Sequence, residues 1–430
     1  MKIIDVSDAF VKKELLRKRL QKRNEALEAY VKKIIKRVQM EGDAALIEFA
    51  KKFDNVSLDA ESLKVSRKEV SEAYGKVTEN QVRALKSMKE RLETVERKVL
   101  EKVSMKVEID GFYIQLQTRP LQRVGCYVPG GKTAYPSTLL MTVVPACVAG
   151  VPNIVVCSPP DRSGSLSPLT LVAADICGVN EIYKVGGPQA IAAMAYGTET
   201  IKPVDKIVGP GNIYVTMAKI LVSRDVAIDF PAGPSELVVL ADETANPRYI
   251  ALDMCAQAEH GPDSIVGLIT TSKSLAQKTL REIEDISQST PRREIVAKAL
   301  LDNGFIAVCK TLEEMVELTN SFAPEHVELI IENPEKVIEG ILAAGIVLVG
   351  PYTPASLSDY YGGTNHVLPT GGYGKFFSAL SCLDFVKRVA VLKCSRNGLL
   401  KAREHVKILS EAENLPGHFK AVEGRFIVEK

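Results

Sequence analysis

The amino-acid sequence predicts an α/β protein made of two open units of parallel strands, with helical extensions at both ends. Three observations support this fold class. Between about residues 120 and 378, short apolar runs of strand length alternate with helical stretches, many of them rich in Ala. Turns rich in Gly and Pro separate the runs, and the alternation restarts near residues 230–240. Such βαβ alternation implies parallel strands with helices on both faces of each sheet.

Residues 1 to about 110 carry many charges and are predicted to be mostly helical. Apolar residues recur there at helical spacing: Val11, Leu15, Leu16, Leu20, Leu27, Val31, Ile34, Ile35 and Val38. Gly42 marks an end for this helical pattern. We interpret the charged face as solvated and expect the apolar stripe to pack on the second α/β unit. A coiled-coil or partner-binding role is the alternative.

Residues 120–235 are predicted to form the first α/β unit, which we expect to bind a dinucleotide. Its strands are expected at 124–128, 153–157, 181–185 and 206–208. Three of them lead into glycine turns, which are Pro129-Gly130-Gly131, Gly186-Gly187-Pro188 and Gly209-Pro210-Gly211. These turns do not match the dinucleotide fingerprint, because the last lacks a third Gly. Three glycine turns at strand ends would still let a dinucleotide phosphate approach the backbone.

Residues 236–378 are predicted to form the second α/β unit, which we expect to hold a metal and the catalytic groups. Its elements are expected as strands at 237–240, 264–269, 305–309 and 346–349, a helix at 247–260 and a long loop at 354–374. The tail, 379–430, is expected to be helical and charged. It is predicted to end in a Pro416-Gly417-His418 turn rather than in further sheet.

Composition narrows the partners and the compartment. The 55 basic and 53 acidic residues nearly cancel, which argues against nucleic acid or an anionic membrane as the main partner. The eight cysteines include no Cys-x-x-Cys pair, so a zinc ribbon or a thioredoxin-like site is not expected. Most lie in apolar runs, as expected of buried thiols in a reducing compartment. We find no signal peptide and no apolar run long enough to span a bilayer, and expect a cytoplasmic protein.

Histidine placement points to an active centre. Of the five histidines, four stand beside Gly, Pro or a carboxylate where the chain is expected to bend: His260, His326, His366 and His418. Imidazole binds metals and moves protons near neutral pH, and functional residues concentrate on loops held by a rigid scaffold. Only His405 is expected on a solvated helix face. The pattern predicts an enzyme with one metal or proton-transfer centre assembled from distant parts of the chain.

Three local patterns are candidates for that centre, each with an ordinary alternative. Gln257 and His260 are three residues apart, so they share one helix face and can both ligate a divalent cation; otherwise they are two surface polar residues. Long glycine-rich loops with embedded Asp and His residues are usually functional, so the loop with Asp359 and His366 is a candidate; the alternative is a mobile surface loop. Glu325-His326 offers two groups for consecutive proton transfers, or an exposed turn.

The chain resembles the histidinol dehydrogenase family over nearly its whole length. Six separate segments agree with that family in the right order: 123–131, 209–212, 233–236, 257–261, 323–326 and 362–366. The resemblance implies two open Rossmann-like αβα units of the aldehyde-dehydrogenase-like type. It also implies an intertwined homodimer with shared active sites, in which the C-terminal tails are exchanged.

The resemblance further implies the chemistry and its residues. The family oxidises L-histidinol to L-histidine through L-histidinaldehyde, the last steps of histidine biosynthesis, with two NAD and one Zn²⁺ per subunit. His326 would be the general base of the hydride steps, and Glu325 would activate water. By motif, the implied zinc ligands are Gln257, His260, Asp359 and His418. The substrate would be bound by these four and by Ser235, His326, His366 and Glu413. The NAD contacts would be Tyr127, Gln189 and Asn212.

Other functions stay open at this point. A related zinc- and NAD-dependent dehydrogenase acting on another amino alcohol or a diol would share these residues. Glu413, five residues before His418, favours histidinol, since an anionic or uncharged substrate has no use for that carboxylate. A zinc hydrolase would use Glu325 to activate water without a nucleotide, and a nucleotide-binding regulatory module would leave the loop residues inert. Cys126 and Cys157 are interpreted as structural rather than as thiol nucleophiles.

Overall fold

A computed structural model describes residues 1–5, 24–130 and 133–427. The chain divides into two compact units. The first contains residues 1–96 and 121–385, and the second contains residues 97–120 and 386–430. This differs from the four consecutive segments expected from the sequence, because both large sheets lie in the first unit.

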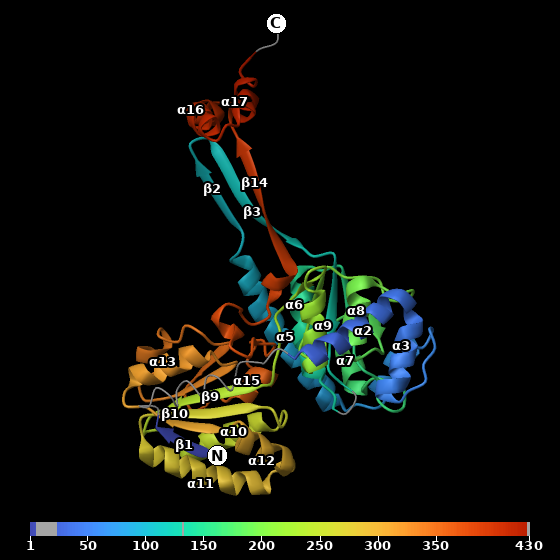
Figure 1. Cartoon of the computed structure of the whole chain (residues 1–430), viewed down its shortest axis with the longest axis vertical. Coiled ribbons are helices and arrows are strands. Elements are labelled where there is room, and N and C mark those ends of the chain that lie inside the picture. Colours follow the sequence, from blue (N-terminus) through green and yellow to red (C-terminus); the bar gives the residue numbers. More distant parts are fainter. Residues whose placement is uncertain (6–23, 131–132, 428–430) are drawn as a thin grey trace. The chain divides into compact units, whose positions relative to one another are not determined.

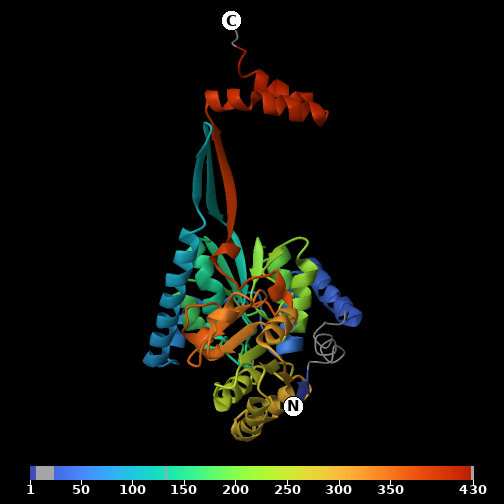
Figure 2. The ribbon, with the colours of Figure 1, turned by 90° about the vertical axis from the view of Figure 1, so that its left-hand side faces the viewer.

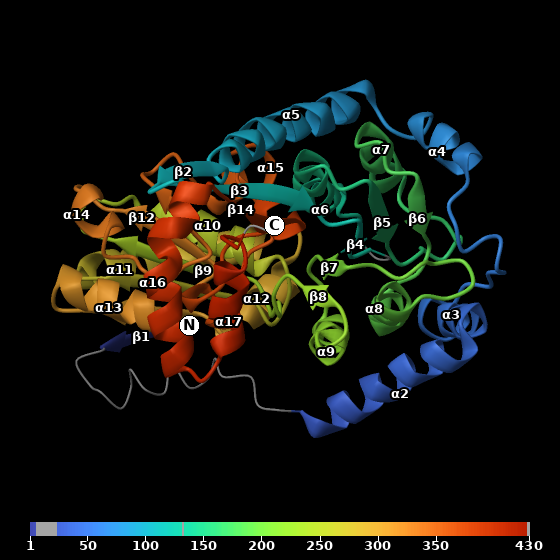
Figure 3. The same ribbon diagram turned by 90° about the horizontal axis from the view of Figure 1, so that it is seen from above.

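The first large sheet confirms the strands expected between residues 120 and 235 and has five parallel strands in the described chain. In sheet order they are β6 (Glu181–Tyr183), β5 (Asn153–Cys157), β4 (Arg123–Tyr127), β7 (Lys206–Val208) and β8 (Ala227–Ile228). Its helices are α6 (Pro136–Ala149), α7 (Pro168–Ile176), α8 (Gly187–Tyr196) and α9 (Ile213–Val222). Figure 3 shows α6 and α7 on one face and α8 and α9 on the other. Numbered along the chain, the order is 3-2-1-4-5, that of a doubly wound nucleotide-binding sheet.

The second large sheet is also parallel and repeats the same order, with one strand added at its edge. In sheet order its strands are β1 (Lys2–Asp5), β11 (Phe305–Val308), β10 (Ile265–Thr270), β9 (Glu236–Ala241), β12 (His326–Ile330) and β13 (Ile346–Val349). Its helices are α10 (Pro247–Ala258), α11 (Lys273–Ser289), α12 (Arg293–Asp302), α13 (Leu312–Phe322), α14 (Glu335–Ile338) and α15 (Ala355–Tyr360). The added strand β1 corrects the expectation of a helical N-terminal segment over its first residues.

The strands of this sheet are apolar because both faces are covered. Along β9, Leu237 and Val239 pack into the cluster that includes α10, α11 and α12. Val238 and Leu240 pack into the cluster on the other face, which includes α13. Successive side chains of a strand point to opposite faces, so a buried parallel strand needs a continuous apolar run. A charged residue within such a strand therefore needs a local partner.

The helix expected around residues 27–38 is confirmed, but its expected partner is wrong. In α2 (Glu25–Glu41), Val31, Ile34 and Val38 are buried in the core of the first sheet, together with residues of α8 and α9. We had expected packing on the second α/β unit. An apolar stripe specifies that one face is buried but not which surface covers it, and the Ala-rich α8 allows a close approach. The predicted stripe residues between 11 and 20 lie outside the described part of the chain.

The rest of the N-terminal segment covers the open edge of the first sheet. It contains α3 (Asp43–Phe49), a π-helical turn (Ala50–Asp54), α4 (Arg67–Tyr74) and α5 (Glu79–Glu101). Val65 N donates to Ile182 O (2.8 Å) and Lys184 N donates to Leu63 O (2.8 Å), so residues 63–65 run along the outer side of β6. This backbone pairing closes an edge that would otherwise expose unpaired peptide groups.

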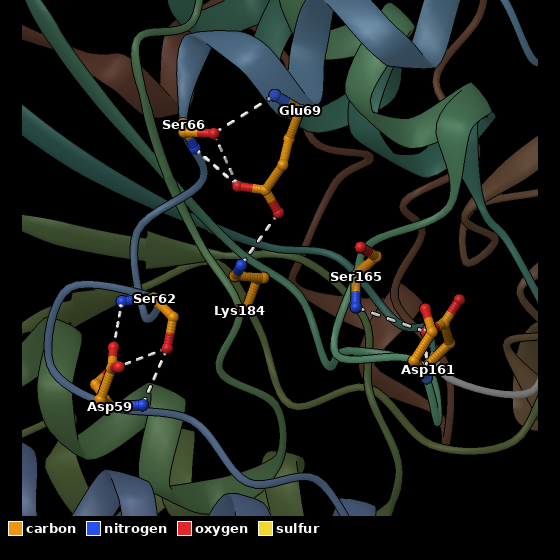
Figure 4. A network of polar contacts seen from close by, with 8 residues as sticks. Asp59, Ser62, Ser66, Glu69, Asp161, Ser165 and Lys184 are labelled. Atoms are coloured by element: carbon orange, nitrogen blue, oxygen red, sulfur yellow. Dashed lines mark hydrogen bonds and ion pairs between the residues drawn. The ribbon is translucent and has the colours of Figure 1, made fainter.

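Side chains fix the same junction, as Figure 4 shows. Ser66 and Glu69 form a reciprocal capping box at the start of α4, which satisfies backbone N–H groups that a helix start leaves free. The second oxygen of the Glu69 carboxylate pairs with Lys184 Nζ at 2.9 Å. Lys184 is 5% exposed, so Glu69 supplies the partner that a buried ammonium needs. The N-terminal segment is thereby tied to the strand that leads into the Gly186-Gly187 turn.

The second unit contains an antiparallel sheet and two helices. Its strands are β14 (Val386–Cys394), β3 (Phe112–Pro120) and β2 (Met105–Ile109), in that order. Helices α16 (Arg396–Ala412) and α17 (Pro416–Glu423) follow β14 (Figures 1 and 2). The prediction of a purely helical tail is therefore wrong for residues 386–394. The Pro416-Gly417-His418 segment is the first turn of α17 rather than a terminal turn, since Pro fits the first helical position.

Most of the cysteines are buried, as expected from their apolar surroundings in the sequence. Cys126, Cys157, Cys255, Cys309 and Cys382 are buried, Cys147 and Cys177 are half-buried, and Cys394 is exposed; all eight are free thiols. Among the described residues, no helix combines the length and the apolar character needed to cross a membrane.

Candidate active site

The amino ends of β9 and β12 bring Glu236, Glu325 and His326 together. The two strands are neighbours, and Leu237 lies opposite His326. Glu236 N donates to Glu325 Oε2 at 2.7 Å, and Glu325 N donates to Glu236 Oε2 at 3.2 Å. Glu236 is 1%, Glu325 7% and His326 2% exposed. The Glu325-His326 pair is thus buried and fixed, which rules out the alternative of an exposed turn.

The hydrogen bonds of His326 define its tautomer. Nδ1 lies 3.1 Å from the carbonyl oxygen of Glu236. A carbonyl oxygen only accepts, so Nδ1 carries a proton, and in the neutral ring the lone pair is on Nε2. Within the described residues, Nε2 is buried without a hydrogen-bond partner. A buried nitrogen left free in this way is available to a group that enters the site.

Charge around His326 overrides the effect of its burial. Burial alone would lower the pKa of His326, but the Glu325 carboxylate, 3.6 Å from Nδ1, and the more distant Asp359 raise the pKa to about 9. His326 is therefore protonated at neutral pH and becomes able to accept a proton at Nε2 as the pH rises toward 9.

Asp359 and His366 lie together, but not in the long loop expected for residues 354–374. Asp359 lies near the end of the short helix α15, and His366 Nδ1 donates to its carbonyl oxygen at 3.2 Å. The Asp359 carboxylate is 3.6 Å from the same nitrogen. On the other side of the ring, Nε2 lies 3.2 Å from Thr138 Oγ1 in α6. His366 thus links the second sheet to a helix of the first, and burial lowers its pKa.

Gln257, His260 and Ser235 are placed on adjoining elements. Gln257 lies in the last turn of α10 and is 3% exposed. His260 is exposed just beyond the helix, and its Nδ1 lies 3.3 Å from Ser235 Oγ. Helix α10 packs against α15, which carries Asp359. The first unit thus contains three of the four expected metal ligands. In the described residues of the single chain, no three His, Cys, Asp or Glu side chains are grouped as a metal site.

The two remaining candidates of this set belong to the second unit. His418 lies in the first turn of α17, and Glu413 ends α16. Both side chains are exposed. The structure therefore places these two residues in a compact unit separate from the other candidates.

The three candidates for nucleotide contacts lie at the carboxyl edge of the first sheet: Tyr127 ends β4, and Gln189 and Asn212 follow β6 and β7. The Tyr127 hydroxyl accepts from Gly187 N at 3.1 Å. Gln189 is 2% exposed, and its Oε1 has no hydrogen-bond partner among the described residues. Asn212 is exposed and already caps α9, because its Oδ1 accepts from Tyr214 N and Val215 N. Ligands of such sheets bind where the strand order reverses, which here is between β4 and β7. Gly131 lies outside the described residues.

Sequence reasoning gave Glu236 no role, although it lies in one of the matched segments. Its carboxylate accepts from Gly371 N at 3.0 Å as well as from Glu325 N, while its backbone holds Glu325 and His326. Glu236 therefore orients both catalytic candidates and the loop that follows His366. A glutamate opening the apolar run Leu237–Leu240 was the signal, since a buried carboxylate needs partners.

A second missed feature is a pair of carboxyl groups behind His326. Glu328 follows His326 by two residues, on the same face of β12, and its Oε1 accepts from Ala355 N at the start of α15 (2.7 Å). Burial and the neighbouring carboxylate of Asp253 raise the pKa of Glu328 to about 8, and burial raises that of Asp253 to about 6. The pair joins β12, α15 and α10, the three elements that carry His326, Asp359 and Gln257.

We predict that Glu328→Gln flattens the dependence of stability on pH. Between its ordinary pKa of 4.5 and its folded value of about 8, the native protein holds a proton that the unfolded chain releases, so stability falls as the pH rises through this range. Gln has no proton to lose. The variant should match the parent at pH 5 and exceed its Tm by about 2–4 °C at pH 9. Exposed Glu332→Gln is the matched control, and parallel Tm profiles for parent and Glu328→Gln would contradict the assignment.

Comparisons with known proteins agree on one family. The family model described as histidinol dehydrogenase matches residues 17–426. The chain is 46% identical over 400 residues to a histidinol dehydrogenase of Methanopyrus kandleri, covering 92% of this chain and 93% of that one. It is 46% identical over 396 residues to that of Methanocaldococcus jannaschii, covering 92% and 91%. The crystal structure of histidinol dehydrogenase from Elizabethkingia anophelis is similar at a TM-score of 0.93 and 38% identity, covering 98% of this chain and 96% of that chain.

Proposed function

Because the chain belongs to the histidinol dehydrogenase family, we propose that it oxidises L-histidinol to L-histidine through L-histidinaldehyde with two NAD and one Zn²⁺ per subunit. The observation that carries this proposal is the buried, unpartnered Nε2 of His326, whose ring is oriented by Glu236 and charged by Glu325. A general base needs a free lone pair and a pKa near the working pH. His326 meets both needs at alkaline pH.

In the first oxidation, His326 Nε2 would take the proton of the substrate hydroxyl, and NAD bound at the first sheet would accept the hydride from the hydroxyl-bearing carbon. The Glu325 carboxylate, 3.6 Å from Nδ1, stabilises the imidazolium that forms. In the second oxidation, Glu325 would take a proton from the water that adds to the aldehyde. His326, after releasing its first proton to solvent, would take a hydroxyl proton of the hydrate, and a second NAD would accept the hydride. The Glu325 carboxylate is oriented for its task by Glu236 N at 2.7 Å.

The donor set of the first unit suits zinc. An imidazole nitrogen, a carboxylate and an amide oxygen from His260, Asp359 and Gln257 are ligand types that Zn²⁺ accepts. A fourth ligand would be His418 of a second copy of the chain. Bound there, the metal would orient the substrate and polarise its oxygen. Ser235 Oγ, 3.3 Å from His260 Nδ1, would hold the ring of that ligand, or contact the substrate beside it.

The second unit supports a homodimer with shared sites. It leaves large apolar side chains exposed on both its sheet and its helices: Met105, Ile109, Leu392, Ile408, Leu409 and Leu415, each 45–63% exposed. Apolar surface gathered on a small unit is typical of a protein interface. Docking against a second copy would cover this surface, and would bring Glu413 and His418 to the substrate of that copy.

Nucleotide binding is proposed at the carboxyl edge of the first sheet. Tyr127 ends β4, and Gln189 and Asn212 follow β6 and β7, around the point where the strand order reverses. The unpartnered Oε1 of Gln189 is free to accept a hydrogen bond from the nucleotide. The near-zero net charge supports a small-molecule substrate rather than nucleic acid. The free thiols support a cytoplasmic location.

The direct test measures NADH formed per histidinol consumed, with and without a chelator. We expect two NADH per histidinol, loss of activity after chelation, and recovery with Zn²⁺. Other amino alcohols and diols should react more slowly, because they cannot use both Glu413 and the imidazole contacts. Turnover without NAD would favour a hydrolase, and NADH formation that ignores the chelator would contradict the metal site.

We predict that His326→Asn and Glu325→Gln affect different half-reactions. His326→Asn should slow histidinol oxidation by about 10²–10⁴-fold, the usual contribution of a general base. Glu325→Gln should slow the conversion of histidinaldehyde to histidine more than the oxidation of histidinol. For the parent, kcat/KM for histidinol should rise with pH up to about 9, because protonated His326 cannot accept a proton. Glu325→Gln removes the main charge that raises this pKa, so its pH profile should shift to lower pH. Equal losses in both half-reactions for both variants would overturn the division of roles.

We predict that two inactive variants restore each other if the site is shared. Asp359→Ala and His418→Ala should each lower bound zinc and abolish activity. When the two variants are co-expressed at equal levels, half of the dimers contain one subunit of each variant. In each of these dimers, one of the two sites keeps both ligands. About a quarter of the parental activity should return. The control mixes Asp359→Ala with Gln257→Ala, which lie in the same unit. Activity from the control mixture, or none from the first mixture, would refute exchange of the tail.

A further inference from the structure

A buried ion pair holds the glycine turn that follows β7. Lys219 on α9 and Asp229, just after β8, are paired, with side chains 2% and 1% exposed. Each member also binds the backbone of Gly209. Lys219 Nζ donates to Gly209 O at 2.9 Å, and Gly209 N donates to Asp229 Oδ2 at 2.8 Å. The peptide groups on both sides of the Gly209 Cα are therefore fixed by one charge pair.

Gly209 has a backbone conformation that needs such support. Its φ is 115°, a conformation that residues with a side chain rarely adopt. A Cβ at this position would collide with the carbonyl oxygen of Tyr127, at the end of β4. Glycine is the most flexible residue in the absence of constraints, so the turn would sample many conformations if nothing fixed it. The ion pair selects one of them.

The turn lies where the first sheet is expected to bind its ligand. It connects β7 to α9 and touches the end of β4, the two strands between which the order of the sheet reverses (Figure 3). Both charges of the pair are almost fully buried and point at the backbone of the turn, so neither is available to a ligand. Their effect on binding acts through the shape of the turn.

We propose that Lys219 and Asp229 are positioning residues for the nucleotide, because they hold Gly209 in the one conformation that leaves the edge between β4 and β7 open to a dinucleotide phosphate. This inference rests on the proposed NAD site. Pre-organising a loop in its binding conformation raises affinity by removing an ordering cost from the binding step.

The Lys219–Asp229 pair differs from the ion pair made by β7. Lys206, at the amino end of β7, pairs with Asp384 at 2.9 Å and also donates to its carbonyl oxygen. That pair lies at the opposite edge of the sheet, and its side chains are 11% and 31% exposed. Within the described chain, this pair makes no hydrogen bond to the Gly209 turn, so it serves as a control.

The test compares two double variants of the full-length, zinc-loaded protein. Lys219→Met with Asp229→Leu removes both charges together, which avoids leaving one buried charge unpaired. NADH affinity is measured by fluorescence titration without histidinol, together with zinc content and histidinol affinity. We expect the Kd for NADH to rise at least about tenfold, with zinc content and histidinol affinity unchanged. In turnover, KM for NAD should rise more than kcat falls. The control, Lys206→Met with Asp384→Leu, should keep the parental Kd for NADH.

The possible results distinguish the proposed nucleotide site from the positioning role of Lys219 and Asp229. No NADH binding by the parent would overturn the proposed nucleotide site, and this inference with it. Parental binding that persists in the Lys219/Asp229 double variant would overturn the positioning role alone. An equal loss in the control variant would do the same. If the double variant does not fold, Lys219→Arg answers the question, because it keeps the charge but cannot place one ammonium on Gly209 O. Weaker NADH binding at unchanged Tm would then support the proposal, and unchanged binding would overturn it.

Discussion

The reciprocal hydrogen bonds between Glu236 and Glu325 join the amino ends of two neighbouring strands, and the rest of the candidate active site is arranged around them. The same glutamate that receives Glu325 N also orients His326 through its carbonyl and fixes the loop at Gly371. The carboxylates of Glu236 and Glu325 and the imidazole of His326 are thereby buried together with their hydrogen-bond partners. Burying these groups costs less free energy than burying unpaired polar groups, because nearly every polar atom has a hydrogen-bond partner. His326 Nε2 is left free, and this is the atom that the proposed chemistry requires.

The two large sheets share one strand order but use opposite edges. In the first sheet, the nucleotide candidates follow the carboxyl ends of β4, β6 and β7, as in other doubly wound sheets. In the second sheet, Glu236 and His326 open β9 and β12, so the catalytic candidates occupy the amino edge. The linker that leaves the first sheet at Asp229 reaches Glu236 after only a few residues. A short connection thus joins the carboxyl edge of the first sheet to the amino edge of the second.

Much of this arrangement could be predicted from the sequence, for a physical reason. Buried parallel strands need continuous apolar runs, and these marked eight of the eleven described strands of the two sheets in advance. Strands β1, β8 and β12 were not expected. The matched segments also contain Gln257, His260, Glu325 and His326. The partner of α2 could not be predicted, because an amphipathic stripe does not specify which surface covers it. Strand β14 was missed because its charged, mostly exposed residues lack the apolar run of a buried strand. The roles of Glu236 and of the Asp253–Glu328 pair depend on contacts between residues about 75–90 positions apart, which no local pattern contains.

Strand β1 has a consequence for how the protein reaches its native state. Lys2–Asp5 pairs with β11, which lies about 300 residues later in the sequence. Residues 63–65 likewise can close the edge of the first sheet only after β6 has been synthesised. Contacts so distant along the chain are slow to form. During synthesis β1 therefore stays without its partner strand until β11 has been made, which exposes β1 to chaperones and proteases for that time.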